Sequence, residues 1–161
     1  RLTIIKNEAN IKGMGVSKLL EAGRVQKIIT THLGLNPVAI RMMNEGEIDV
    51  EFNPQGILAE RIRAGGAGLF GLLTDISVDT ILKDKKKTVE LDGRTLILET
   101  ALRANVATAF IPVIMLTARH YLEDESETAN YAHMFDEYVV KPFVVRDLMG
   151  KIKKLIEGDP A

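Results

Sequence analysis

Short apolar runs alternate with helix-like segments along this sequence, and that alternation limits the possible folds more than any other feature. Strands that are joined by helices lie parallel in a sheet, and the helices cover both faces of that sheet. The expected strands are residues 2–5, 25–34, 48–52, 69–74, 111–118 and 137–140, and the expected helices are residues 15–23, 36–46, 53–68, 125–135 and 144–158. The sequence therefore predicts an α/β fold, in which a mostly parallel sheet carries helices on both faces.

Capping residues mark the ends of two of the expected helices. Asn36 is a favoured N-cap, Pro37 suits the first helical position, and Gly46 can end the same helix. Ser17 is expected to cap the preceding helix, which Gly23 would end. These signals place two short helices between the first three expected strands.

Residues 88–99 carry the strongest local signal. Two β-rich runs flank Asp92-Gly93, a pair that is favoured in the tight turn of a β-hairpin. This hairpin is expected as one antiparallel insertion in the otherwise parallel arrangement. The run KDKKK at 83–87 precedes it and is expected to be a solvated loop tip.

The composition excludes several classes of function. The formal net charge is −1, which leaves no basic footprint for nucleic acid and no patch for a membrane surface. The chain has no cysteine, so disulfides, thiolate catalysis and cysteine-ligated metal are excluded. His32, His120 and His133 show no metal-site spacing, so no metal is expected. No apolar run approaches the roughly 18 residues that span a bilayer, and cytoplasm is the default expectation.

Residues 2–107 contain three stretches that together resemble the α subunit of the 3-oxoacid and acetate coenzyme A transferases. The stretches are GVSKLLEAGRVQKIITTHLGLNP, MNEGEIDVEFNPQGILAERIRAGGAGL and LDGRTLILETALRANVA. The resemblance implies that a coenzyme A thioester is a possible ligand and that no other cofactor is required. It also implies that a possible partner is a transferase β subunit.

The resemblance assigns roles within the stretch NPQGILAERIRAGGAG. In this family the glutamine of the PQG sequence helps to form the oxyanion hole for the thioester carbonyl, and Gln55 occupies that position. Glu60 and Arg61 are expected to be structural ion-pair residues. The candidate cofactor-binding residues are the glycines Gly56, Gly65, Gly66 and Gly68. Without the resemblance, the same glycines are typical of turns and helix caps.

The sequence departs from the transferase pattern at three points. It contains neither the glycine-rich GGF stretch of the family nor the segment with the nucleophilic glutamate, which belongs to the β subunit or half. The loop that usually reads TPTG-x-GT is TDISVDT at residues 74–80, without either glycine. Because a carboxylate must attack the thioester to form the enzyme–coenzyme A intermediate, complete catalysis by this chain is not expected.

From residue 111 onward the sequence resembles the closing half of a response-regulator receiver domain, through IPVIMLTA, DEYVVKPF and VVRDLMGKIKKLIEG. In that family Lys141 would neutralise a phosphoaspartate, and the bond to Pro142 is often cis. Thr117 would supply the hydroxyl that responds to phosphorylation. Without the resemblance, Lys141 is an ordinary charge at the end of a strand.

Asp75 has two interpretations. Receivers carry their phosphoacceptor at the end of the third strand, in a setting similar to LLTDIS, so Asp75, Thr117 and Lys141 could form a receiver site. However, a receiver needs a pair of acidic residues for magnesium after its first strand, where KNEAN offers only Glu8. The surrounding sequence is transferase-like, so the simpler interpretation places Asp75 in a variant transferase loop.

The length of 161 residues suits one α/β domain, in which a transferase-like part, 1–107, and a receiver-like part, 108–161, would share one sheet. The expected function is that of a coenzyme A transferase α-subunit-like fragment, within an engineered or recombined chimera that lacks complete catalysis. The alternatives are a receiver-like signalling module and a scaffold without activity.

Overall fold

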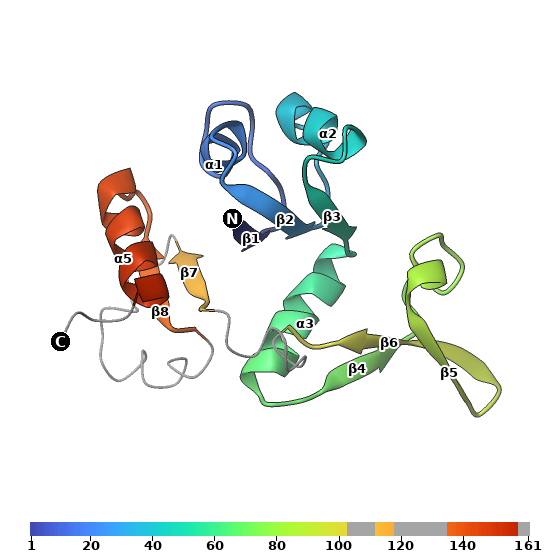
Figure 1. Ribbon diagram of the computed structural model, residues 1–161. Coiled ribbons are helices and arrows are strands. Elements are labelled where there is room, and N and C mark those ends of the chain that lie inside the picture. Colours follow the sequence, from blue (N-terminus) through green and yellow to red (C-terminus); the bar gives the residue numbers. More distant parts are fainter. Residues whose placement is uncertain (103–111, 118–134, 158–161) are drawn as a thin grey trace. The chain divides into compact units, whose positions relative to one another are not determined.

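The computed structural model describes residues 1–102, 112–117 and 135–157 (Figure 1). The chain divides into two compact units. Unit 1 consists of residues 1–61 and 72–99, and unit 2 consists of residues 62–71 and 100–161. His120, His133 and the expected helix at 125–135, apart from its last residue, lie outside the described residues.

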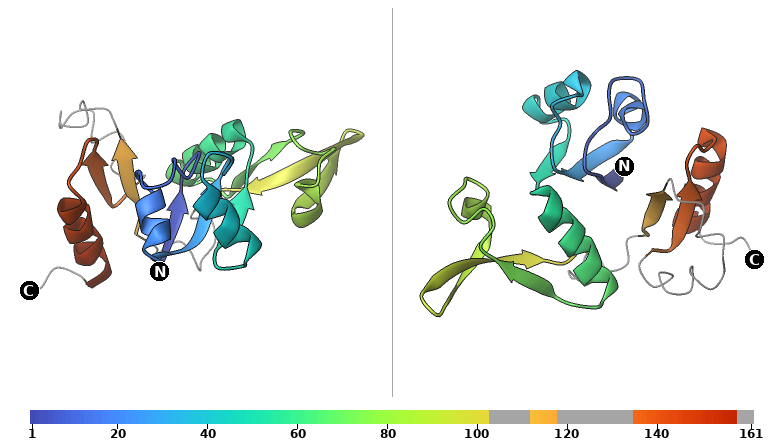
Figure 2. Two further views of the ribbon diagram at one scale, coloured as in Figure 1. Left: turned by 90° about the horizontal axis from the view of Figure 1, so that it is seen from above. Right: turned by 180° about the vertical axis from the view of Figure 1, so that it is seen from behind.

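A three-stranded parallel sheet forms the centre of unit 1. Its strands, in spatial order, are β1 (Leu2–Ile5), β2 (Val25–Thr30) and β3 (Asp49–Phe52). The connections contain α1 (Ser17–Glu21) and α2 (Pro37–Asn44), which lie on the same side of the sheet (Figures 1 and 2). Two right-handed crossovers that advance in one direction across a sheet produce this arrangement.

The apolar core of unit 1 lies between the sheet and these two helices. Ile4, Ile28 and Val50 are partners in register, so their side chains point to the same face of the sheet. Leu20 from α1 and Met42 from α2 belong to the same core, and the side chains of Leu20 and Ile28 are completely buried. Burial of the β-branched runs on this face explains why they form strands.

The helix α3 (Gln55–Gly66) follows β3 directly and lies on the opposite face of the sheet. Lys27 pairs in register with Asp49, and Glu51 lies two residues further along β3, so these three charged residues share that face. Arg61 of α3 bonds to Glu51. The predicted α/β fold with helices on both faces of a parallel sheet is therefore confirmed.

A second sheet contains β4 (Gly71–Thr74), β6 (Arg94–Thr100) and β5 (Lys87–Leu91), in that order. β5 and β6 are antiparallel, with Leu91 opposite Arg94 across the turn. Asp92 and Gly93 have φ values of 48° and 73°, the left-handed geometry of a tight hairpin turn. The predicted hairpin is confirmed.

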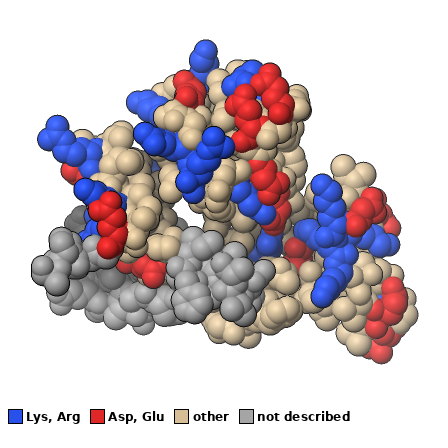
Figure 3. Space-filling model, viewed as in Figure 1, with Lys and Arg blue, Asp and Glu red and all other residues tan. Residues whose placement is uncertain are grey.

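The lysine-rich run before the hairpin is not a purely solvated tip. It forms a short 3₁₀ helix, Lys83–Lys85, and then enters β5. Lys86 makes an ion pair with Glu99, whose side chain is only 3% exposed. A buried carboxylate requires such a partner, so the sequence expectation is wrong for Lys86. On the face drawn in Figure 3, basic and acidic side chains lie side by side around the hairpin.

Unit 2 contains a two-stranded parallel sheet and the long helix α5 (Val145–Glu157). Its strands are β7 (Ile114–Thr117) and β8 (Glu137–Val140), with Thr117 opposite Val140. Lys151 of α5 donates to Glu137 Oε1 at 2.8 Å and to the carbonyl oxygen of Tyr138 at 2.9 Å. These contacts attach the helix to β8. The peptide bond between Lys141 and Pro142 is cis, as expected.

The described strands form three sheets, which are β1–β2–β3, β4–β6–β5 and β7–β8. Two expectations about elements need correction. Val16, not Ser17, is the N-cap of α1, because the Ser17 hydroxyl donates to Glu21 Oε1 instead. β2 ends at Thr30 because the next residue, Thr31, turns to donate its N–H to the carbonyl oxygen of Asn7.

None of the helices in the described part of the chain combines the length and the apolar character that crossing a bilayer demands.

Candidate functional site at the carboxyl edge of the parallel sheet

The three parallel strands of unit 1 end at one edge, and the loops that follow them are joined by hydrogen bonds. The N–H of Asn53, after β3, donates to the carbonyl oxygen of Thr30 at 2.9 Å. Glu8, after β1, forms a parallel β-bridge with His32, after β2. Ligands of open α/β sheets bind outside the carboxyl ends of the strands, so this edge is the first place to look for a site.

Gln55, the predicted oxyanion-hole residue, lies at this edge as the first residue of α3. Gln55 and Gly56 are exposed, whereas Ile57 and Leu58 are buried and anchor the first turn of the helix. The first hydrogen bond of this turn runs from Leu58 N–H to Pro54 O at 2.9 Å. The N–H groups that precede it have no partner within a helix, so the turn can present donors and a positive dipole end to an oxygen.

A partly buried polar network connects the residues on either side of this turn. Arg61 Nη1 donates to Glu51 Oε1 at 2.5 Å and to Asn53 Oδ1 at 2.6 Å. Asn53 Nδ2 is 3.4 Å from the carbonyl oxygen of Glu51, and Lys27 Nζ is 2.9 Å from Glu51 Oε2. Asn53 and Arg61 are 2% and 7% exposed. The network therefore ties β2, β3 and α3 together on both sides of Pro54.

Glu51 is held in its ionised form by this network. Its partial burial opposes ionisation, but the hydrogen bonds and positive charges of Arg61 and Lys27 outweigh that effect and lower its pKa to about 2. For Arg61, the expectation of a structural ion pair is confirmed. Neither Glu51 nor Asn53 was predicted from the sequence as a functional residue. The available signal was a carboxylate inside an alternating strand, ten residues before an arginine on the next helix.

The structure gives local reasons for two of the predicted cofactor glycines. A Cβ at Gly65 would lie 2.1 Å from the carbonyl oxygen of Leu102, so this glycine permits a close approach of the chain to itself. Gly68 has a φ of 70° after the end of α3, where Leu69 N–H donates to Ala64 O. Gly56 has open space around it. Of these three, only Gly56 lies at the sheet edge next to Gln55.

The predicted receiver residues are distributed over two sheets. Lys141 directly follows Val140, the register partner of Thr117, so Thr117 and Lys141 end neighbouring strands of the β7–β8 sheet. Asp75 is exposed and follows β4, which pairs with β6 in the hairpin sheet. Strand pairing therefore brings Thr117 and Lys141 together and does not bring Asp75 to their edge.

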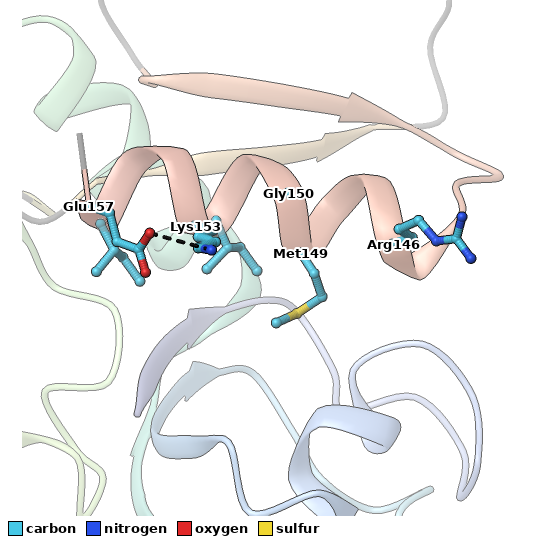
Figure 4. Close-up of a pocket in the computed structure, with 7 residues that line it drawn as sticks. Arg146, Met149, Gly150, Lys153 and Glu157 are labelled. Carbon is cyan, nitrogen blue, oxygen red and sulfur yellow. Dashed lines mark ion pairs between the residues drawn. The ribbon is translucent and has the colours of Figure 1, made fainter. Parts of the chain in front are cut away.

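The surface of α5 carries a shallow depression, but the residues that line it do not have the arrangement of a ligand-binding site. Met149 and Ile152 line it together with Lys153 and Glu157, which form an ion pair at 3.7 Å (Figure 4). All of its lining residues come from one helix, so no polar groups converge from different elements. Within the described ranges, no three histidine, aspartate or glutamate side chains gather as metal ligands would.

Comparison with known proteins identifies the family. The family model described as "Coenzyme A transferase" matches residues 1–110. The chain belongs to the coenzyme A transferase family. It is 37% identical to the α subunit of acetate CoA-transferase from Escherichia coli K12, over 91% of this chain and 75% of that protein. It is 41% identical to the α subunit of acetoacetyl-CoA:acetate/butyrate CoA transferase from Clostridium acetobutylicum, over 66% of this chain and 49% of that protein.

A solved structure shares the fold. The apoenzyme of an acyl-CoA transferase from Escherichia coli O157:H7 aligns with a TM-score of 0.58 at 20% identity, over 88% of this chain and 33% of that one. The transferase resemblance expected from residues 2–107 is thus confirmed. These similarities give no support to a receiver-like half or to a chimera, and the alignment with the E. coli K12 protein covers 91% of the chain.

Proposed function

We propose that this chain acts as the α-subunit part of a coenzyme A transferase, which moves coenzyme A from an acyl thioester to a carboxylate. The observation that carries the proposal is the position of Gln55, exposed at the first turn of α3 and at the carboxyl edge of the parallel sheet. The two curated relatives described above are α subunits of CoA transferases, and one of them is named for acetoacetyl-CoA and for acetate or butyrate.

The proposed chemistry divides the work between two polypeptides. The β polypeptide supplies a carboxylate that attacks the thioester carbonyl, and negative charge develops on the carbonyl oxygen. The carbon–sulfur bond then breaks to leave an acyl anhydride, and the released coenzyme A thiolate attacks the enzyme's carboxyl carbon, which forms the enzyme–coenzyme A thioester and frees the carboxylate product. The Gln55 side-chain amide donates a hydrogen bond to that oxygen, and the free N–H groups of the first turn of α3 add a positive field. One donor aimed at a developing oxyanion contributes about 3 kcal/mol of barrier lowering.

Assembly and activity provide the test. The chain is mixed with the β subunit of a related transferase, and transfer of coenzyme A from acetoacetyl-coenzyme A to acetate is followed. Activity is expected only with both polypeptides present, and Gln55→Ala is expected to lower kcat by about 100-fold. Gln26→Ala, which changes an exposed glutamine of β2, is the matched control. Absence of complex formation and of transfer, together with no heat on titration of the chain with acetyl-coenzyme A, would remove the proposal.

A second candidate function is phosphotransfer to Asp75, and the register of Thr117 opposite Val140 is the observation in its favour. It puts a hydroxyl residue and Lys141 at one sheet edge, as a receiver site requires. Against it, Asp75 follows a strand of the hairpin sheet. Incubation with acetyl phosphate and magnesium, followed by intact mass measurement, decides the matter. An unchanged mass in wild type, or an equal gain in Asp75→Asn, rejects Asp75 as phosphoacceptor.

A further inference from the structure

The turn that carries Gln55 has little of its own to hold it in place. Gln55 and Gly56 are exposed, and glycine leaves the backbone freer than any other residue. The contacts that fix the turn come from its two sides: Asn53 before it and the buried pair Ile57 and Leu58 after it. An oxyanion donor must keep its geometry within a fraction of an ångström, so the groups that hold these flanks bear on catalysis.

Arg61 connects the two flanks of the turn. Its Nη1 donates to Asn53 on the strand side, while its own backbone belongs to the helix side, one turn after Ile57. The same Nη1 donates to Glu51, whose other oxygen is held by Lys27 of the neighbouring strand. The guanidinium group is thus clamped to the sheet, and the first two turns of α3 are clamped with it.

A network of this kind has two possible roles that differ in what they predict. If it only stabilises the fold, its loss weakens all hydrogen bonds of unit 1 together. If it positions the turn, its loss loosens the hydrogen bonds at the ends of the turn before it affects distant ones. Asn53 N–H to Thr30 O and Leu58 N–H to Pro54 O bracket the turn, so these two amides report on it.

We infer that Arg61 is a positioning residue, which holds the turn Asn53-Pro54-Gln55 in a fixed conformation through its bonds to Glu51 and Asn53. The inference rests on the proposed function as far as catalysis is concerned. The structural part of the inference, that Arg61 fixes the conformation of this turn, does not depend on the proposed function. Arg61 itself is 7% exposed, so its proposed role is to act through the turn.

Hydrogen exchange tests the structural content. In Arg61→Gln, exchange at Asn53 and Leu58 is expected to rise at least about tenfold relative to exchange at Ile40, whose N–H donates to Asn36 O in α2. The control is Arg41→Gln, which removes an exposed arginine of α2 that pairs with Glu47, a residue beyond the end of that helix. The control is expected to leave the ratio unchanged. An equal rise at all three amides in Arg61→Gln overturns the inference.

Kinetics of the assembled transferase test the catalytic content. Arg61→Gln is expected to lower kcat about tenfold or more while KM for the thioester stays within about twofold, since the donor loses alignment and the binding surface is retained. If wild type is inactive with every β subunit, the proposed function fails and the exchange ratio still decides the positioning role. If wild type is active and Arg61→Gln keeps its kcat, the inference fails and the proposed function stands.

A conservative variant covers the case in which Arg61→Gln does not fold. Arg61→Lys keeps the positive charge beside Glu51 but replaces the rigid planar guanidinium by a flexible ammonium. It is expected to fold and to show a smaller rise of the Asn53 and Leu58 ratio, with a partial recovery of kcat. A ratio and a kcat equal to those of wild type in Arg61→Lys, with Arg61→Gln unfolded, would assign Arg61 to stability alone.

Discussion

At the scale of single residues, Glu51 is a partly buried carboxylate that two cationic side chains hold in its ionised form. Arg61 and Lys27 each hold one of its oxygens, and their combined effect lowers its pKa to about 2 in spite of partial burial. A carboxylate with a lowered pKa stabilises the folded state above its ordinary pKa, and this stabilisation is lost as the pH falls toward the folded-state value.

We predict that the free energy of unfolding contains a contribution from Glu51 that disappears between about pH 5 and pH 2. The contribution at neutral pH is about 2 kcal/mol, after discounting for the 31% of the side chain that stays exposed. Urea unfolding of wild type and Glu51→Gln across this range measures it. The difference between the two proteins should shrink as the pH falls, and a constant difference would contradict the assignment.

A second prediction concerns the glycines of α3. Gly65→Ala places a methyl group against the Leu102 carbonyl oxygen and is expected to destabilise the protein by about 1–3 kcal/mol or more. Gly56→Ala meets open space in a helix and is expected to be neutral or to stabilise by up to about 1 kcal/mol. Thermal unfolding of the pair gives the comparison. Equal effects would show that the approach of Leu102 is not required.

At the scale of elements, the caps decide where the helices of unit 1 begin. Asn36 joins α2 to the loop after β1, because its Oδ1 accepts from Ala39 N–H at 3.0 Å and its Nδ2 donates to Ala9 O at 3.1 Å. Its side chain is almost completely buried. One residue therefore both caps a helix and satisfies a carbonyl oxygen of another loop.

We predict that Asn36→Ala lowers the free energy of unfolding by about 2–3 kcal/mol, since it removes the cap and leaves the Ala9 carbonyl oxygen without its donor. Asn36→Asp retains the cap acceptor but loses the donor and places a negative charge beside the Ala9 carbonyl oxygen. Because that charge lies at the positive end of α2, the loss is still expected to be smaller than for Asn36→Ala. Denaturant unfolding of the three proteins gives the order. An Asp variant that is less stable than the Ala variant would show that the buried negative charge outweighs the cap.

At the scale of the whole molecule, the division into two units has a spectroscopic consequence. The chain has no tryptophan and three tyrosines, Tyr121, Tyr131 and Tyr138, all within residues 100–161 of unit 2. Tyrosine fluorescence therefore follows unit 2, whereas far-ultraviolet circular dichroism follows the helices and strands of both units. The β1–β2–β3 sheet of unit 1 and the β7–β8 sheet of unit 2 share no strand, which permits the two sheets to unfold separately.

We predict that tyrosine fluorescence and far-ultraviolet circular dichroism give different midpoints for unfolding in urea. Coincident transitions would mean that the 161 residues unfold as one cooperative domain, as the length of the chain by itself suggested. Fluorescence of Tyr138→Phe provides the control, since Tyr138 lies beside Phe135 and Lys151 and should account for much of the change.

Local patterns were sufficient for much of the fold. The parallel strands, the cap and first turn of α2, and the Asp92-Gly93 hairpin follow from side-chain periodicity and from residues with special backbone preferences, and these are properties of a few neighbours in sequence. Ser17 was misjudged because Glu21, one helical turn away, competes for its hydroxyl. Lys86 was misjudged because its partner Glu99 lies on another strand.

The same limit on prediction from local sequence applies to the candidate site. Three stretches of the sequence indicated the family to which the chain belongs, and that resemblance singled out Gln55 in the PQG sequence after β3. The sequence by itself thus determined the order of the described strands, the cap of α2 and the hairpin, since each depends on local chemistry. Only the tertiary structure decided that Arg61 reaches back to Glu51 and Asn53, that Gly65 admits the Leu102 carbonyl oxygen, and that the strands divide among three sheets. Those features depend on distances between residues far apart along the chain, and these distances are set by packing.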